Sequence, residues 1–243
     1  RVTPRMPRAV DDADGKFSLS DLGAGRWTLA VAGKGRPVTR VDVEIEPGKT
    51  TDGVRVRLTR GATLVGAVTD RATRRPIVDA VVSIDVREAA FAVDPARTNG
   101  RGEYRLEGVP EGLFSLDVRH PDYVGRLVSG LDAKGQRQLR ADVDLQASGD
   151  SGATLEMSGI GATLIPGPTR VQVSGVREAG PAARAGLQAG DEIDAIDGAS
   201  AAAMDVQACV QLLRGPPGTT VRVGVLRDGV RIDLAIERDT IVQ

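Results

Sequence analysis

Apolar and polar residues alternate with a period of two along much of the first 150 positions. The alternation is clear at Phe17 and Leu19 and again from Trp27 to Val31. It returns at residues 39–48, 53–61 and 140–149. A strand with one buried face has this period, because successive side chains point to opposite sides of a sheet. The pattern predicts a mainly β protein built from short strands.

The N-terminal half of the chain contains an internal repeat. DADGKFSLSDLGAGRWTLAV (12–31) aligns without a gap on NGRGEYRLEGVPEGLFSLDV (99–118), at an offset of 87 residues. The offset pairs Phe17 with Tyr104 and Trp27 with Phe114. Each copy predicts a strand, a short connection with glycine and a second strand.

One copy lies in a longer stretch that resembles a known family. GATLVGAVTDRATRRPIVDAVVSIDV (61–86), followed by the second copy of the repeat, resembles the carboxypeptidase regulatory-like domain. The residues that carry the resemblance are Gly66, Val68, Asp70, Pro76, Ala80 and Val82. The resemblance implies a transthyretin-like β-sandwich of about seven strands over residues 61–147.

The first copy departs from this family pattern. A counterpart of residues 61–87 would have to start at position −26. Residues 1–60 are therefore expected to form a partial sandwich with unpaired strand edges. Either the sequence starts inside a domain, or the opening strands come from elsewhere. Asp12 and Asp14, before Gly15, predict a hairpin turn, because the spacing of a calcium loop is not met.

The pattern changes after SGDSG (148–152), which is expected to be a linker. GPAARAGLQAGDEIDAIDG (180–198) predicts a short helix that begins at Pro181 and ends near Gly186, followed by a strand from Ile193 to Ile196. The stretch resembles a PDZ domain of the bacterial envelope-protease type. The resemblance covers residues 152–240 and implies an α+β domain after the two sandwich modules, of which the first is incomplete.

MSGIGATLI (157–165) contains two glycines one residue apart. A phosphate-binding turn would need a further glycine or a lysine, and PGP (166–168) excludes a following helix. A plain glycine turn remains an alternative. The resemblance to PDZ domains implies that this loop holds the terminal carboxylate of a peptide, which adds as a strand beside residues 162–165.

A helix is predicted from Asp205 to Arg214, with Val206, Val210 and Leu213 on one face. The resemblance implies that this face forms the second wall of the groove. Val206 is apolar where many PDZ domains have a histidine, which predicts a hydrophobic-x-hydrophobic peptide end. Val210 and Leu213 could instead simply pack the core. The full set of candidate peptide-binding residues is Gly159, Ile160, Gly161, Ala162, Thr163, Leu164, Val206, Val210 and Leu213.

Composition limits the remaining possibilities. The net charge of −1 gives no attraction to nucleic acid, and no apolar run is long enough to insert into a membrane. With one histidine and one cysteine, the chain is expected to hold no metal site, no cofactor and no catalytic group set. The few aromatic residues lie on predicted strand faces, which disfavours sugar binding.

These observations favour a non-enzymatic peptide-binding or scaffold segment of a larger bacterial protein of the periplasm, the cell surface or the secreted fraction. Its expected partner is a protein or peptide C-terminus. One alternative is the regulatory, substrate-presenting part of a protease or secretion machine whose catalytic domain lies upstream. Another is a carbohydrate-binding adhesin.

Overall fold

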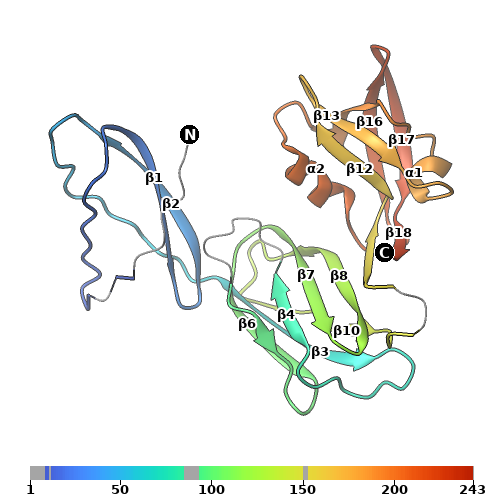
Figure 1. Cartoon of the computed structure of the whole chain (residues 1–243), viewed down its shortest axis with the longest axis horizontal. Coiled ribbons are helices and arrows are strands. Elements are labelled where there is room, and N and C mark those ends of the chain that lie inside the picture. The colour runs from blue at the N-terminus through green and yellow to red at the C-terminus, as the bar shows by residue number, and fades with distance from the viewer. Residues whose placement is uncertain (1–8, 11, 85–92, 150–152, 243) are drawn as a thin grey trace.

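The computed structural model describes residues 9–10, 12–84, 93–149 and 153–242. In this part of the chain, strands account for almost all of the regular secondary structure, with two short helices. Figure 1 shows three units in chain order: a long hairpin, a β-sandwich and a C-terminal module that carries both helices. The mainly β prediction is confirmed.

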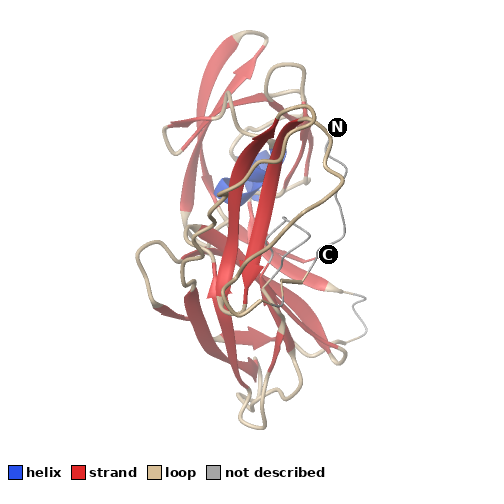
Figure 2. Cartoon of the chain, turned by 90° about the vertical axis from the view of Figure 1, so that its left-hand side faces the viewer, coloured by secondary structure: helices blue, strands red, loops and turns tan. Residues whose placement is uncertain are grey.

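The N-terminal unit is one antiparallel hairpin. β1 (Gly25–Gly33) pairs only with β2 (Arg36–Ile45), in a register that places Trp27 opposite Val43. Figure 2 shows these two strands in front of the rest of the molecule. Their counterparts at the repeat offset are β7 (Leu113–His120) and β8 (Tyr123–Asp132), which form the same hairpin in the second copy. The internal repeat is therefore structural.

Two predicted strands of the first copy do not form. Phe17 and Leu19 lie outside any strand, with exposed fractions of 39% and 40%, and residues 53–61 are also without strand structure. Their counterparts in the second copy are β6 (Glu103–Val109), β9 (Gln138–Arg140) and β10 (Val143–Leu145), and all three pair with β3 (Ala62–Asp70). No strand among the described residues lies beside these segments, so their backbone groups have no ladder to join. Phe17 was placed on an apolar strand face by the sequence pattern, but it is exposed and does not belong to the core.

The second unit is a complete sandwich. One sheet has the order β10-β3-β6, with β9 also paired to β3. The other contains β8, β7, β4 (Val81–Ile84) and β5 (Ala96–Arg97). The core between the sheets is aliphatic, with Tyr104 and Phe114 buried in it. Gly66 is required on β3, because a Cβ there would lie 1.8 Å from the carbonyl oxygen of Ala141.

The C-terminal module is built around a separate sheet. The order is β12 (Ala162–Pro166), β13 (Val171–Val176), β14 (Glu192–Ile196), β16 (Thr220–Arg227) and β17 (Val230–Glu237), with β15 (Ala199–Ser200) paired to β14. Helices α1 (Pro181–Arg184) and α2 (Val206–Leu213) pack on it. Both predicted helices and the predicted strand at Ile193–Ile196 are confirmed.

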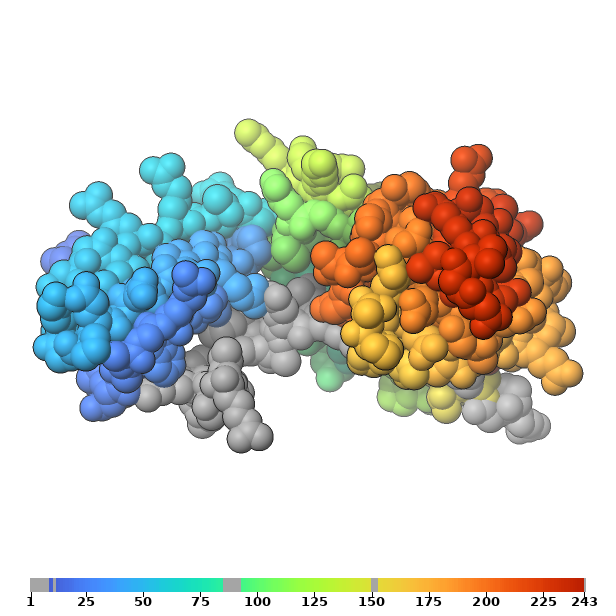
Figure 3. All heavy atoms as spheres, turned by 90° about the horizontal axis from the view of Figure 1, so that it is seen from above, coloured from blue at the N-terminus to red at the C-terminus, as the bar shows by residue number. Residues whose placement is uncertain are grey.

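Two further strands join the C-terminal module to the sandwich. β11 (Leu155–Gly159) pairs in parallel with β8 and antiparallel with β18 (Asp239–Val242). The resulting sheet has the order β18-β11-β8-β7-β4-β5. The predicted linker at 148–152 falls largely outside the described residues, but the strand that follows it is hydrogen-bonded to the sandwich. Figure 3 shows the module, in orange and red, lying against the green sandwich.

In the described part of the chain, neither helix has the length or the apolar character to span a membrane. No group of three or more histidine, cysteine, aspartate or glutamate side chains there is placed to bind a metal ion.

Candidate peptide-binding site

The glycine loop lies between β11 and β12. Gly161 has a positive φ of 74°, which a residue with a side chain adopts only at a cost. The carbonyl of Ile160 accepts a hydrogen bond from the amide of Ala182 (2.8 Å), and that of Gly161 accepts one from the amide of Arg177 (2.8 Å). The loop is thereby fixed against α1 and the end of β13.

These two bonds orient the next two amides. In a trans peptide the carbonyl and the N–H point in opposite directions, and none of the described peptides is cis. The N–H groups of Gly161 and Ala162 therefore point away from the groups that bind the carbonyls of Ile160 and Gly161. Neighbouring N–H groups at a turn of this kind can hold an anion.

β12 is the last strand of its sheet. It pairs on one side with β13, from Ala162 opposite Val176 to Pro166 opposite Val171. The sheet has no strand beyond it among the described residues, and α2 packs beside it. An edge strand next to a helix leaves backbone groups that an extended peptide could pair with.

Helix α2 is held at both ends. The side chain of Asp205 accepts a hydrogen bond from the amide of Ala208 (2.7 Å), which satisfies one of the free N–H groups of the first turn. At the other end, Arg238 donates to the carbonyls of Leu212 (2.8 Å) and Leu213 (3.0 Å). The helix that would form the second wall of a groove is therefore firmly placed.

The nine predicted site residues all lie on the end of β11, the loop, β12 and α2. Ile160 and Leu213 are buried in the core of the module. For Leu213 this agrees with the alternative that it simply packs the core. Ala162, Leu164 and Val206 are partly buried against that core. Gly159 is buried, Gly161 and Val210 are half-buried, and Thr163 is exposed. The pairing of these residues with a peptide stays a prediction.

Cys209, on the same helix, is fully buried. Burial raises the pKa of its thiol, with a smaller contribution from Asp205. It behaves as a small apolar residue of the core.

Two arginines that the sequence did not single out lie beside the loop. A Cβ added at Gly159 would lie 3.8 Å from Cγ of Arg214, and one added at Gly161 would lie 3.5 Å from Cβ of Arg177. These contacts involve the stems of the side chains, and the guanidinium of Arg177 donates to the carbonyl of Val242 (3.2 Å). No local motif marks either residue, because each comes near the loop only through the packing of α2 and β13.

The side chain of Asp191 is only 1% exposed, the lowest value in any described ion pair of the module. It accepts two hydrogen bonds from Arg227 (2.7 and 2.8 Å) and one from the amide of Gln188 (2.9 Å). Burial alone would raise the pKa of this carboxyl, but the bonds from Arg227 and Gln188 outweigh it and hold the pKa below its ordinary value. The pair fixes the turn that leads into β14.

Comparisons with known proteins agree with this description. The model of the carboxypeptidase regulatory-like domain matches residues 63–146, and that of the PDZ domain matches residues 172–227. The carboxy-terminal processing protease CtpA of Bacillus subtilis is 35% identical over 101 residues, which are 41% of this chain and 22% of that protein. Bacillopeptidase F of the same organism is 32% identical over 114 residues, 46% of this chain and 8% of that protein.

Among solved structures, the PDZ domain of a carboxy-terminal protease from Vibrio cholerae in complex with peptide is 30% identical. The match covers 36% of this chain and 98% of that one, with a TM-score of 0.34. The chain spans less than a quarter of the length of either Bacillus relative. From its strand order, its helices and the two family matches, the chain contains a carboxypeptidase regulatory-like domain followed by a PDZ domain.

Proposed function

We propose that the PDZ domain captures the C-terminal end of a peptide by strand addition to β12. PDZ domains are peptide-binding modules, and the one in this chain is similar to those of bacterial proteases. The observation that carries the proposal is the orientation of the amides of Gly161 and Ala162, away from α1 and β13, beside the open edge of β12. A terminal carboxylate would accept hydrogen bonds from these amides.

The apolar residues along the groove define the peptide. Ile160, Ala162, Val210 and Leu213 would surround the terminal side chain, and Leu164 with Val206 would contact the residue two positions before it. This arrangement favours a hydrophobic-x-hydrophobic end. Two such side chains, at roughly 1.5–3 kcal/mol each, and the added strand correspond to micromolar affinity, about −8 kcal/mol.

The rest of the chain would then serve as a scaffold. β11 pairs with β8 of the sandwich, which supports a scaffold role for residues 61–147 beside the PDZ domain of residues 152–240. The proposal is a non-enzymatic segment of a larger bacterial protein of the envelope, the surface or the secreted fraction.

A second candidate function follows from the relatives. Both Bacillus proteins are named as peptidases or proteases, although the matches cover only a small part of each. The chain could present C-terminal peptide ends to a protease domain. Addition of the chain would then speed the cleavage of a substrate with a hydrophobic-x-hydrophobic end by its cognate protease, and no change would dismiss this candidate.

Binding is tested with a labelled peptide that ends in Val-Ala-Leu and its C-terminally amidated twin. Fluorescence anisotropy should give micromolar affinity for the free acid and a loss of at least about tenfold for the amide, because the amide lacks the charge that the loop would hold. Equal affinity for both peptides, or no binding to either, would refute carboxylate capture.

Val206→Ala tests the groove wall. The change removes two methyl groups and should weaken binding by about tenfold at ~0.8 kcal/mol per buried group. A peptide with glycine two residues before its end should not respond to the substitution. Val230→Ala is the matched control, because Val230, at the start of β17, is 64% exposed. If both peptides weaken equally with Val206→Ala, that residue does not contact the predicted position.

A further inference from the structure

Four charged side chains cross the junction between the sandwich and the PDZ domain. Glu156, on β11, has an exposed fraction of 6%. It pairs with Arg71 (2.9 Å) and Arg126 (3.5 Å) of the sandwich, and both arginines also pair with Asp144 (2.5 and 2.6 Å). Burial alone would raise the pKa of Asp144, but Arg71 and Arg126 outweigh it and lower that pKa. Each arginine contacts both carboxylates, so removal of one member would leave the charges of this partly buried cluster unbalanced.

β11 carries this contact to the end of α2. Ser158 lies two residues after Glu156 and therefore on the same face of the strand. Its hydroxyl donates to the carbonyl of Gly215, in the turn that directly follows α2. Arg238, which immediately precedes β18, binds the last carbonyls of the helix. The strand pair that is joined to the sandwich thus holds the C-terminal end of α2.

The side of α2 away from β12 meets the sandwich directly. Gln211 shares a hydrogen bond with Ser115 of β7 (3.3 Å), and Ser115 shares one with Ser129 of β8 (3.1 Å). Next to them, Gly130 lets Pro216 approach, because a Cβ at Gly130 would lie 3.1 Å from Cδ of that proline.

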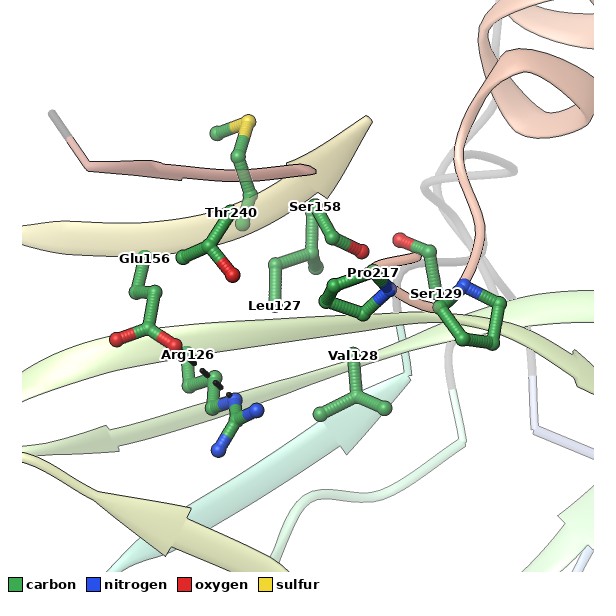
Figure 4. Close-up of a pocket in the computed structure, with 10 residues that line it drawn as sticks. Arg126, Leu127, Val128, Ser129, Glu156, Ser158, Pro217 and Thr240 are labelled. Carbon is green, nitrogen blue, oxygen red and sulfur yellow. Dashed lines mark ion pairs between the residues drawn. The ribbon is translucent and has the colours of Figure 1, made fainter. Parts of the chain in front are cut away.

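The junction is held by these specific contacts and not by a closed apolar core. A small cavity of about 90 Å³ remains between β8, β11 and the turn after α2. Figure 4 shows that Arg126 and Glu156 face each other at one side of it, while Pro217 and Ser129 lie at the other. Because the apolar packing is incomplete, the polar contacts determine where α2 lies relative to the sandwich.

We infer that the carboxypeptidase regulatory-like sandwich is a brace for the peptide groove: the Glu156–Arg71–Arg126 contact positions α2, and thereby sets peptide affinity without touching the peptide. The expected effect on peptide affinity rests on the proposed function. The expected effect on the position of α2 does not. Glu156 and Arg71 are positioning residues, since they act through β11 and the turn after α2.

The test uses the full chain with Glu156→Gln, which keeps the size of the side chain and removes its charge. Hydrogen exchange of the α2 amides, measured by mass spectrometry without peptide, should accelerate by about tenfold, within the usual range of coupling between sites. Exchange in the β16–β17 hairpin should stay as in the wild type. The affinity for the Val-Ala-Leu peptide should fall by about tenfold in the same variant.

Arg71→Gln should reproduce both effects, and Arg71→Lys should lie closer to the wild type because the charge is kept. Glu103→Gln is the matched control, since Glu103 forms an ion pair of the sandwich in which its side chain is 52% exposed. It should change neither quantity by more than about twofold. If Glu156→Gln does not fold, Arg71→Gln decides the question.

Unchanged α2 exchange in both variants would overturn the inference, because the helix would then be held by the PDZ domain alone. Equal acceleration in α2 and the β16–β17 hairpin would also overturn it, since that result indicates a general loss of stability. If the wild type binds no peptide, the proposed function fails, while the exchange of α2 still decides whether the sandwich positions the helix.

Discussion

Arg238 is a buried cation whose nearest polar partners are neutral oxygens. Its exposed fraction is 8%, and it donates to the carbonyls of Leu212 and Leu213 and to Oγ1 of Thr219 (3.1 Å). Burial lowers the pKa of this arginine, with an opposing effect from Asp197. The side chain closes the C-terminal end of α2, where a helix has carbonyls without internal partners.

Replacement of this residue should therefore be costly. Arg238→Met keeps most of the apolar stem but leaves the carbonyls of Leu212 and Leu213 without their donor. Hydrogen bonds from a charged group contribute about 1.5–3 kcal/mol each, and a cation at a helix C-terminus about 0.3–1 kcal/mol more. The cost of burying the arginine charge offsets part of this gain. We expect a net loss of about 3 kcal/mol in the free energy of unfolding of the PDZ domain.

The assay has to report on this domain alone. The sequence from residue 152 onward contains no tryptophan or tyrosine, so intrinsic fluorescence reports on the other two units. Hydrogen exchange of β16 and β17 in increasing urea, followed by mass spectrometry, gives the free energy of unfolding of the PDZ core. Arg238→Met should shift this transition to clearly lower urea.

Arg231→Met is the matched control on the neighbouring strand. Its side chain is 55% exposed and pairs with Asp194 and Asp233, so its loss should cost at most about 1 kcal/mol. Arg238→Lys should fall between Arg238→Met and the wild type, because it keeps the charge but not the planar fork. Coincident transitions for Arg238→Met and Arg231→Met would refute this account of the helix end.

Two further predictions concern single residues. Gly66→Ala should destabilise the sandwich by at least about 3 kcal/mol in thermal unfolding, since its Cβ would overlap the carbonyl of Ala141; Gly100→Ala, with nothing within 4 Å, should have little effect. Asp191→Asn should cost the PDZ domain ~2 kcal/mol at neutral pH through the loss of its bonds to Arg227. The pKa of Asp191 is lower in the folded than in the unfolded domain. The ionised carboxylate therefore stabilises the fold fully above the unfolded pKa of about 3.9, and this stabilisation is lost as the pH falls through the folded pKa. The free energy of unfolding in urea should therefore fall less between neutral and acidic pH in Asp191→Asn than in the wild type. The same fall in both proteins would contradict this prediction.

Local sequence was sufficient for the elements whose signals lie within a few residues. The start of α1 was predicted from Pro181, and its end from the glycine that follows it. The start of α2 was predicted from Asp205. The repeat predicted the second strand of each copy, β1 and β7, and each of these pairs with the next strand along the chain, β2 and β8, across a short turn. Such strands need only their neighbour in sequence to complete a ladder.

Elements that depend on distant partners were decided by the tertiary structure alone. Phe17 and Leu19 have the alternation of a strand, but a strand forms only where a second backbone supplies hydrogen bonds, and no described strand lies beside them as β3 lies beside β6. In the same way, nothing near residue 156 indicates that β11 pairs with β8, or that Arg71 reaches Glu156 across 85 positions. Periodicity shows which face of a segment is apolar, whereas its partner is chosen by the packing of the whole chain.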